Sequence, residues 1–262
     1  MLDDAQLAAR LAFAVDLAQR AGQVALEYFQ QPHTLKVSSK GPQDFVSQAD
    51  YDTELVIRQA LADRFPGDAF VGEETGGQEV DSHTGVWVVD PIDGTQPFLM
   101  GMATWCVSIA FALGDQMLIG VVYAPVTNEL FAARLGHGAT CNGRRIAVRA
   151  ATSLTEGVVS VGYSRNTTIE QLVHVMGEMA RQGGMYHRNG SGALSLCYVA
   201  CGQLIGYIEP YINSWDCLAA LVIIREAGGI TNDFLAEHGL VTGGAVFAAS
   251  PAIYPTIRDL LP

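Results

Sequence analysis

Acidic side chains stand at several points of the chain where an apolar segment ends or a helix is expected to begin. Glu73 and Glu74 follow the apolar residues FVG, and Asp90 and Asp93 lie in the segment DPIDGT, directly after VWVV. Asp216 stands in the segment SWDCLAA, where we expect a helix. Charged groups beside such apolar runs are costly to bury unless cations compensate them. Carboxylate oxygens are the ligands that hard divalent cations such as Mg²⁺ prefer, so these acids are candidate metal ligands.

Such a set of acids is typical of the Mg²⁺-assisted hydrolysis of phosphate esters. Two ions about 4 Å apart can bind the attacking and the leaving oxygens of an in-line displacement. Bound cations also reverse the local charge, which allows an acidic site to accept an anionic substrate. The residues alone leave a structural alternative open, in which the acids cap helices and occupy loops. Asp50, in the segment QAD, and Asp216 both fit first helical turns, where carboxylates stabilise a helix.

The segment DPIDGT has a composition that suits a turn close to a ligand. Pro91 fixes φ and lacks an N–H, so we expect the preceding strand to end there. Gly94 lets the backbone approach a ligand closely. If a helical turn starts near Thr95, its free N–H groups face outward and can bind an anion.

Composition and charge predict an acidic folded protein. The chain has 262 residues, of which 49% are hydrophobic, and 15 Lys and Arg stand against 27 Asp and Glu, for a net charge of −12. An acidic surface repels nucleic-acid backbones and anionic membranes, so we expect neither a nucleic-acid nor a membrane partner. The start MLDDAQLAAR has no features of a secretory signal, and five cysteines are an odd number for a disulfide scaffold. We therefore expect a cytoplasmic protein.

Hydrophobic spacing and turn residues predict an α/β fold. In the first half we expect a helix at 5–29, a loop or short hairpin at 30–46, a helix capped by Ser47, strands at 69–72 and 86–90, and an antiparallel meander from Thr104 to about Ile146. In the second half we expect a strand at 157–164, helices at 168–181 and 192–201, a strand at 203–209, a helix from Ser214, a strand at 245–250 and a final helix. The change of pattern near residue 150 predicts two tightly packed subdomains, 1–150 and 151–262.

Three segments resemble the signature motifs of the inositol monophosphatase family, in the family's order. They are VGEET at 71–75, WVVDPIDGT at 87–95 and WDCLAA at 215–220. Shorter matches are DFVSQAD at 44–50, CNGRRI at 141–146 and EAGG at 226–229. The resemblance implies a layered αβαβα sandwich, usually a homodimer. It also implies Mg²⁺-dependent hydrolysis of inositol monophosphate, or of a related polyol or sugar phosphate, by in-line attack of a metal-activated water with two or three ions bound.

The resemblance assigns five residues to the metal ions. Glu73 would bind the first and third ions, and Asp90 would bridge the first and the second. The backbone carbonyl of Ile92 would complete the first site, while Asp93 and Asp216 would hold the second ion. Four carboxylates and one carbonyl would therefore form the metal centre.

The resemblance also assigns the reacting groups. Thr95 would orient the attacking water through its hydroxyl, Asp50 would accept the proton, and Glu73 would join them as a catalytic residue. Backbone N–H groups of Gly94 and Thr95 would bind the phosphate. Apart from the resemblance, Lys40, in the loop before Asp50, is either a further candidate for a phosphate contact or an ordinary solvated surface lysine.

The substrate's alcohol would meet residues of the C-terminal subdomain. Glu209, seven residues before Asp216, stands at the family position that reads a substrate hydroxyl. Gly190, Ser191 and Gly192 fall on the loop that borders the sugar or inositol ring, and Asp216 lies beside it. These residues would decide which alcohol is accepted.

The chain departs from the family pattern only beside the substrate. Gln96 and Pro97 follow DPIDGT where the family has Thr-Asn or Lys, Leu221 follows the WD motif where Gly is common, and Gly192 replaces a frequent alanine. None of these changes removes a metal ligand. Ile92 and Gln96 disfavour the adenosine-bisphosphate branch of the superfamily.

Two alternatives to an inositol phosphatase stay open. A histidinol-phosphate phosphatase uses the same metal acids and differs at the loop that borders the ring. A catalytically silent binding or regulatory protein would keep the fold alone. The intact set of acids, together with Thr95, argues against silence, because a silent relative has no need of it.

Overall fold

The computed structural model describes residues 2–41, 44–77, 81, 83–238 and 240–261. Its helices are α1 (Asp4–Phe29), α2 (Gln48–Arg64), α3 (Thr95–Leu99), α4 (Ile169–Arg181), α5 (Gly192–Ala200), α6 (Ser214–Glu226), α7 (Phe234–His238) and α8 (Tyr254–Arg258). Two 3₁₀ turns lie at Pro32–Thr34 and Leu154–Glu156. The helices expected from the sequence are confirmed. The structure also contains the short helix α7, which hydrophobic spacing did not indicate.

The strands form one hairpin and two sheets. The hairpin pairs β1 (Val37–Gly41) with β2 (Asp44–Ser47). In spatial order the larger sheet has β3 (Ala69–Gly72), β4 (Gly85–Asp93), β5 (Cys106–Leu113), β6 (Gln116–Ala124), β7 (Glu129–Arg134), β8 (Ala139–Cys141) and β9 (Arg144–Arg145). The smaller sheet has β11 (Met185–His187), β10 (Val158–Val161), β12 (Gly206–Ile212), β14 (Gly244–Ala249) and β13 (Ile230–Thr231). From β4 to β9 each neighbour is antiparallel, which confirms the predicted meander.

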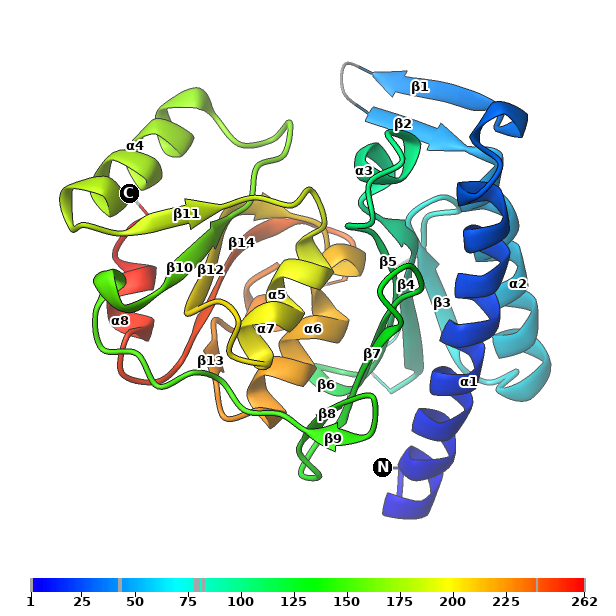
Figure 1. Cartoon of the computed structure of the whole chain (residues 1–262). Coiled ribbons are helices and arrows are strands. Elements are labelled where there is room, and N and C mark those ends of the chain that lie inside the picture. The colour runs from blue at the N-terminus through cyan, green and yellow to red at the C-terminus, as the bar shows by residue number, and fades with distance from the viewer. Residues whose placement is uncertain (1, 42–43, 78–80, 82, 239, 262) are drawn as a thin grey trace.

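The elements stack in five layers, as the αβαβα expectation required (Figure 1). Helices α1 and α2 pack on the outer face of the larger sheet. Helices α5 and α6 fill the space between the two sheets, and α4 and α8 pack on the far face of the smaller one. Helix α6 is buried at every residue from Cys217 to Ile224, because both of its sides face a sheet. A continuous apolar run such as LAALVII is what that central position requires.

Strand β4 corrects the expectation that Pro91 ends the strand. The strand continues to Asp93, which pairs with Cys106, and all nine of its residues are buried. The register shifts between Asp90 and Asp93, so the residue without an N–H falls in the irregular part of the ladder. A bulge of this kind accommodates proline inside a sheet and turns the strand locally.

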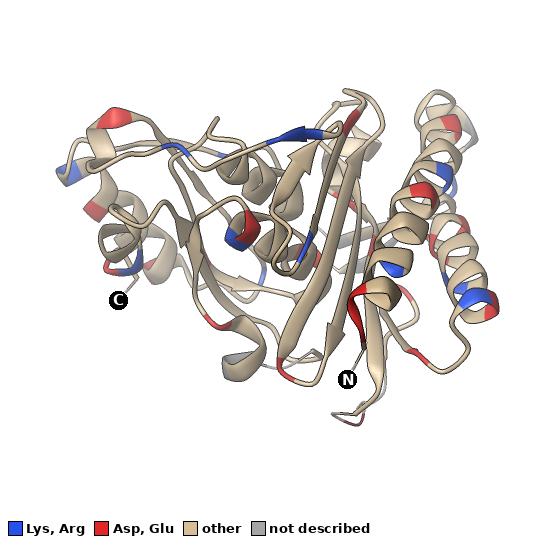
Figure 2. Ribbon diagram, turned by 90° about the horizontal axis from the view of Figure 1, so that it is seen from below, with Lys and Arg blue, Asp and Glu red and all other residues tan. Residues whose placement is uncertain are grey.

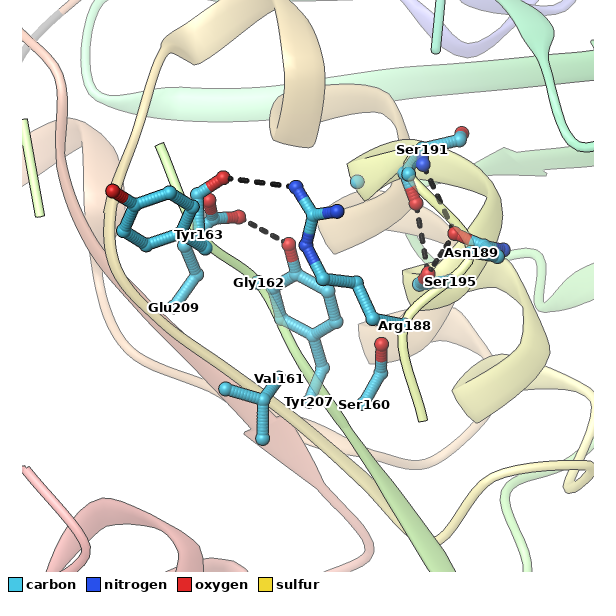
Figure 3. Close-up of a pocket in the computed structure, with 12 residues that line it drawn as sticks. Ser160, Val161, Gly162, Tyr163, Arg188, Asn189, Ser191, Ser195, Tyr207 and Glu209 are labelled. Carbon is cyan, nitrogen blue, oxygen red and sulfur yellow. Dashed lines mark hydrogen bonds between the residues drawn. The ribbon is translucent and has the colours of Figure 1, made fainter. Parts of the chain in front are cut away.

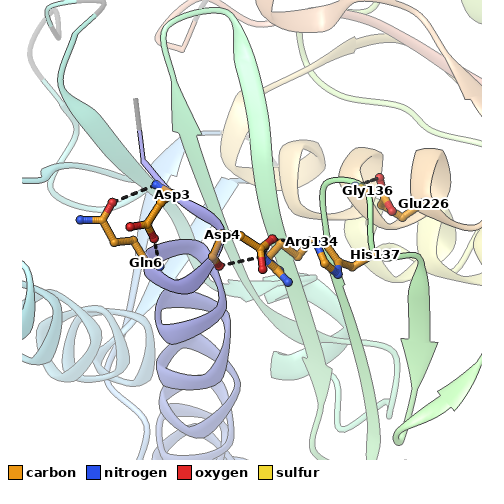
Figure 4. Close-up of polar contacts among 7 residues, drawn as sticks. All are labelled: Asp3, Asp4, Gln6, Arg134, Gly136, His137 and Glu226. Carbon is orange, nitrogen blue, oxygen red and sulfur yellow. Dashed lines mark hydrogen bonds and ion pairs between the residues drawn. The ribbon is translucent and has the colours of Figure 1, made fainter.

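Polar contacts attach the start of α1 to the end of β7 and the turn after it (Figure 4). Asp3 and Gln6 form a capping box at the helix start. The Arg134 guanidinium donates to the Asp4 backbone carbonyl at 2.9 Å, and His137 Nε2 lies 2.9 Å from the Asp4 carboxylate. These contacts fix the outer helix against β7.

Charged residues of both signs alternate along the outer helices α1 and α2 (Figure 2). Arg20 and Asp16 form an ion pair at 2.8 Å, four residues apart on α1. Among the described residues, no helix combines the length and the apolar character that crossing a membrane requires.

The division of the chain into two subdomains near residue 150 stays a prediction.

Candidate active site

Three carboxylates from distant parts of the sequence meet where β3 and β4 end and α6 begins. Carboxylate oxygens of Glu73, Asp90 and Asp216 all lie within 4.8 Å of one another. Glu73 follows β3, Asp90 lies in β4, and Asp216 stands in the first turn of α6. Because β3 and β4 are parallel, their carboxyl ends meet at one edge of the sheet. The order of elements thus brings together acids that are 143 residues apart at most.

Burial and mutual repulsion make this cluster unfavourable without compensation. Asp90 is 1% exposed, and burial first, then the negative charges of Glu73, Asp216 and Asp93, raise its pKa well above the usual value. Burial also raises the pKa of Asp216. Asp90 Oδ1 accepts a hydrogen bond from the Ile92 N–H at 2.8 Å, which holds one oxygen in place. Asp216 accepts from the Asn213 N–H and side-chain amide at 3.4 and 3.3 Å, so it is a helix cap as well.

Asp93 is fixed by the start of α5. One of its oxygens accepts from the Ala193 N–H at 2.7 Å and from the Ser191 hydroxyl, and the other accepts from the Gly192 N–H at 3.1 Å. Burial, followed by the nearby Asp216 charge, raises the pKa of Asp93 to about 7 despite these hydrogen bonds. The loop expected to border the substrate therefore also orients a candidate metal ligand.

Thr95 and Asp50 occupy different environments. The Thr95 hydroxyl donates to the Ile92 carbonyl at 3.3 Å, and Thr95 lines the cavities beside the acids. Asp50 is fully buried and accepts from the Ser47 N–H at 2.8 Å and the Ser47 hydroxyl at 2.7 Å. Asp50 therefore belongs to a helix capping box, as the structural alternative predicted. Its role as proton acceptor stays a prediction. The side chain of Lys40 lies outside the described part of the chain.

Glu54 is a buried carboxylate that the sequence analysis did not single out. It is 1% exposed and accepts from the backbone N–H groups of Glu74 and Thr75 at 2.9 and 3.0 Å. It therefore holds the turn that carries Glu73. The only signal in the sequence was an acid on the buried face of α2, which it shares with Ile57 and Leu61.

Glu209 lies at the wall of the site, on β12 (Figure 3). Its carboxylate accepts from the Tyr207 hydroxyl, and burial raises the pKa of Glu209 to about 8. Gly162 leaves the space that this carboxylate occupies, because a Cβ there would lie 2.2 Å from Glu209 Oε2. Glu209 is thus a buried acid held by a tyrosine, and its role in reading a substrate hydroxyl stays a prediction.

Two adjoining cavities make up the site. The first has a volume of about 160 Å³ and is lined by the predicted residues Glu73, Asp90, Ile92, Asp93, Gly94, Thr95, Gly190, Gly192, Glu209 and Asp216. The second, of about 340 Å³, shares Glu73, Gly94 and Thr95 with the first and extends to Gln96, Arg165 and Arg188. Ser191 lines a smaller recess beside Glu209. Within the described residues, Asp50 is the one predicted site residue that lines none of these cavities.

The donor set fits divalent cations. Every side chain in the cluster offers hard carboxylate oxygens, with Asp90 buried and Glu73 and Asp216 half-buried at the wall of the cavity. Mg²⁺ is held by a few carboxylates and keeps positions for phosphate and water. An apolar or purely capping role would not bring three carboxylates this close, since like charges at such distances destabilise each other.

The raised pKa values predict how the stability of the metal-free protein depends on pH. Asp93 has an unfolded value near 3.8 and a folded pKa of about 7, so the folded state holds a proton that the unfolded state has lost. The free energy of unfolding therefore falls as pH rises from about 4 to 7, and Glu209 extends the fall to about 8. We expect a lower urea midpoint at pH 8 than at pH 5.5 in EDTA, and saturating Mg²⁺ to remove the difference. Equal midpoints in EDTA would contradict the buried acid cluster.

The fold is a layered α/β sandwich with a candidate metal-binding cluster of carboxylates, and comparison with known proteins identifies its family. The inositol monophosphatase family matches residues 6–260, so the chain belongs to this family.

Individual relatives cover nearly the whole chain. Inositol-1-monophosphatase of Mesorhizobium japonicum is 38% identical over 242 residues, which are 91% of this chain and 91% of the relative. A protein of Pasteurella multocida named Nus factor SuhB is 34% identical over 251 residues, with 95% and 94% covered. The crystal structure of extragenic suppressor protein suhB from Bartonella henselae superposes with a TM-score of 0.88 at 31% identity, covering 96% of this chain and 98% of that one.

Proposed function

We propose that this chain is a Mg²⁺-dependent phosphomonoesterase that converts inositol monophosphate, or a related polyol or sugar phosphate, to the alcohol and inorganic phosphate. The observation that carries the proposal is the group of carboxylates of Glu73, Asp90 and Asp216 within 4.8 Å at the wall of a cavity. The likeness to a protein named inositol-1-monophosphatase supports the same chemistry.

The metal centre follows the sequence assignment. Glu73, Asp90, Asp93, Asp216 and the carbonyl of Ile92 would hold two or three Mg²⁺ ions. When bound, these ions neutralise the acids and the phosphate and stabilise the charge that develops during the displacement. The hydrogen bonds from α5 keep Asp93 oriented toward the first cavity.

Thr95 lines both cavities of the site, and the proposal gives the reacting groups the roles expected from the sequence. The hydroxyl of Thr95 would accept a hydrogen bond from the attacking water, and Asp50 would take up the proton. Backbone N–H groups of Gly94 and Thr95 would bind the phosphate oxygens. Gly94 has φ of +97° and a Cβ there would lie 2.8 Å from the Thr104 carbonyl, so only glycine fits this turn.

Glu209 would read a hydroxyl of the leaving alcohol, and Glu209→Gln tests this role. Above pH 8, where Glu209 is ionised, the amide keeps the volume and weakens a charge-assisted hydrogen bond worth about 1.5–3 kcal/mol. We expect kcat/KM for inositol 1-phosphate to fall about 10- to 100-fold, and by clearly more than kcat/KM for p-nitrophenyl phosphate, which has no such hydroxyl. Glu178→Gln, an identical change on the outer helix α4, is the matched control. Equal losses on both substrates would assign Glu209 to support of the metal site instead.

A phosphate-release panel with Mg²⁺ tests the proposed function. It contains inositol monophosphates, histidinol phosphate, fructose bisphosphate, NADP and adenosine bisphosphate. Highest kcat/KM on an inositol or other polyol phosphate supports the proposal, and highest kcat/KM on histidinol phosphate selects the first alternative. Because a 34% identical relative is named a Nus factor, binding without catalysis is the second candidate, and a panel without any phosphate release would select it.

Cellular location and assembly belong to the same proposal. We expect a cytoplasmic homodimer that binds a small phosphorylated polyol and neither nucleic acid nor membrane. Light scattering of the purified chain measures the assembly state directly.

A further inference from the structure

Two arginines line the wider cavity of the candidate site. Arg165 lies in the loop between β10 and α4, and Arg188 follows β11 directly. Both line the cavity of about 340 Å³ together with Glu73 and Thr95. Among the described residues, the other charged side chains that line this cavity and the adjoining 160 Å³ cavity are carboxylates. The positive charge of the site thus lies in the wider cavity, which of the clustered acids contains only Glu73.

Arg188 is positioned to offer donors to a ligand. Its Nη2 donates to the Tyr163 carbonyl at 3.3 Å, and the side chain extends between Tyr163 and the loop that carries Ser191 (Figure 3). A guanidinium has five N–H donors, so this bond leaves donors for the cavity. Glu209 on the same wall accepts a hydrogen bond from the Tyr207 hydroxyl, and its charge also interacts with that of Arg188.

Arg165 lines the same cavity from the loop between β10 and α4. Its Nη1 packs against the end of β1, where a Cβ added to Gly41 would lie 2.7 Å away. The close packing against the hairpin restricts this long side chain while it still lines the cavity. A restricted guanidinium loses less conformational freedom when it binds an anion, which favours affinity.

The wider cavity offers space for the leaving group of the substrate. If the reacting phosphate lies at Gly94 and Thr95, which both cavities share, the leaving group extends into the space toward Arg165 and Arg188. A neutral polyol offers only hydroxyls to these two charges. A phosphate or carboxylate matches a guanidinium with two parallel hydrogen bonds, which are about twice as strong as neutral ones.

We propose that Arg165 and Arg188 form an anion subsite, and that the enzyme prefers phosphomonoesters whose leaving group carries a second anionic group. The inference rests on the proposed phosphomonoesterase function and narrows its substrate class. It applies to a second phosphate and to a carboxylate, which share the same recognition chemistry.

Two substrate pairs test the subsite and distinguish its possible ligands. Fructose 1-phosphate is compared with fructose 1,6-bisphosphate, and glycerol 3-phosphate with 3-phosphoglycerate, by phosphate release in Mg²⁺. We expect kcat/KM to be at least about tenfold higher for the member with the extra anion. Preference in the first pair alone identifies a phosphate subsite, and preference in the second pair alone a carboxylate subsite.

Variants assign that preference to the arginines. The quantity measured is the ratio of kcat/KM for the substrate with the extra anion to kcat/KM for its partner. In Arg188→Gln and in Arg165→Gln we expect this ratio to fall about tenfold. Arg181→Gln, which removes the same charge from the exposed helix α4, should keep the wild-type ratio. In the wild-type protein the ratio should also fall as salt is added, because screening weakens an exposed ion pair.

Three results would overturn the inference. One is a wild-type enzyme that hydrolyses both members of each pair equally well. Another is a loss in Arg188→Gln that is the same for both members, which would indicate a structural role. The third is no hydrolysis of any phosphomonoester, p-nitrophenyl phosphate included, and this result alone would also overturn the proposed function.

Discussion

Asp90→Asn should lower kcat/KM for inositol 1-phosphate by about 10³-fold, the equivalent of several kcal/mol of lost electrostatic stabilisation. Asp90 is the central acid of the cluster, with Glu73 and Asp216 beside it and Asp93 three residues later. An amide keeps the shape and can still accept from the Ile92 N–H, but it no longer offsets cationic charge. Steady-state phosphate release measures the loss.

The same variant has an opposite effect on the metal-free protein. Because neighbouring carboxylates repel Asp90, removing its charge should raise the melting temperature in EDTA at pH 7.5. Mg²⁺ should raise the melting temperature of the wild-type protein by about 5 °C or more, and that of the variant much less. A variant that is destabilised in EDTA and still gains full stability from Mg²⁺ would show that Asp90 is not a metal ligand.

Thr95→Ala should lower kcat by about 10²–10⁴-fold, the range of lost general-base assistance. The hydroxyl lies at the boundary of both cavities and is the group that would orient the attacking water. KM should change little, because the acids and the backbone N–H groups that bind phosphate are intact. Rapid kinetics with inositol 1-phosphate measures both constants.

Thr95→Ser is the matched control for this residue. Serine keeps the hydroxyl that bonds the Ile92 carbonyl and removes only a methyl group, so it should recover most of the rate. An alanine variant with normal kcat would remove Thr95 from the mechanism, and equal losses in alanine and serine variants would show that the methyl group, and not the hydroxyl, matters.

The sequence predicted the local elements and most of the residues that meet at the cavity. Acids at element ends, together with the family motifs, were sufficient to select Glu73, Asp90, Asp93 and Asp216, which all line one cavity. This worked because a motif fixes both a ligand and the turn that presents it. Periodicity alone did not give the five layers, since it reports which face of an element is buried and not what covers that face.

Features that depend on long-range contacts were missed. Glu54 was not singled out in the sequence, yet it accepts hydrogen bonds from the turn that carries Glu73, about twenty residues away. The hydroxyl of Ser191 bonds Asp93 across ninety-eight positions, which no local pattern contains. Pro91 was expected to end β4 because its missing N–H was weighed without the bulge that accommodates it.

Asp50 and Asp216 show that the capping and functional explanations do not exclude each other. Each accepts hydrogen bonds in a first helical turn, and Asp216 also stands in the acid cluster. A cap fixes the carboxylate's rotamer, so the same bonds that stabilise the helix can position a metal ligand. Sequence spacing alone could not separate the two, since both place an acid at the same position.

The central claim is that the carboxylates of Glu73, Asp90 and Asp216 bind Mg²⁺ and thereby make the chain a phosphomonoesterase. The most direct test is phosphate release from inositol 1-phosphate by protein stripped with EDTA and then titrated with MgCl₂. We predict no turnover before Mg²⁺ is added and a rate that rises to saturation as Mg²⁺ is supplied. Undiminished turnover in excess EDTA would contradict the claim.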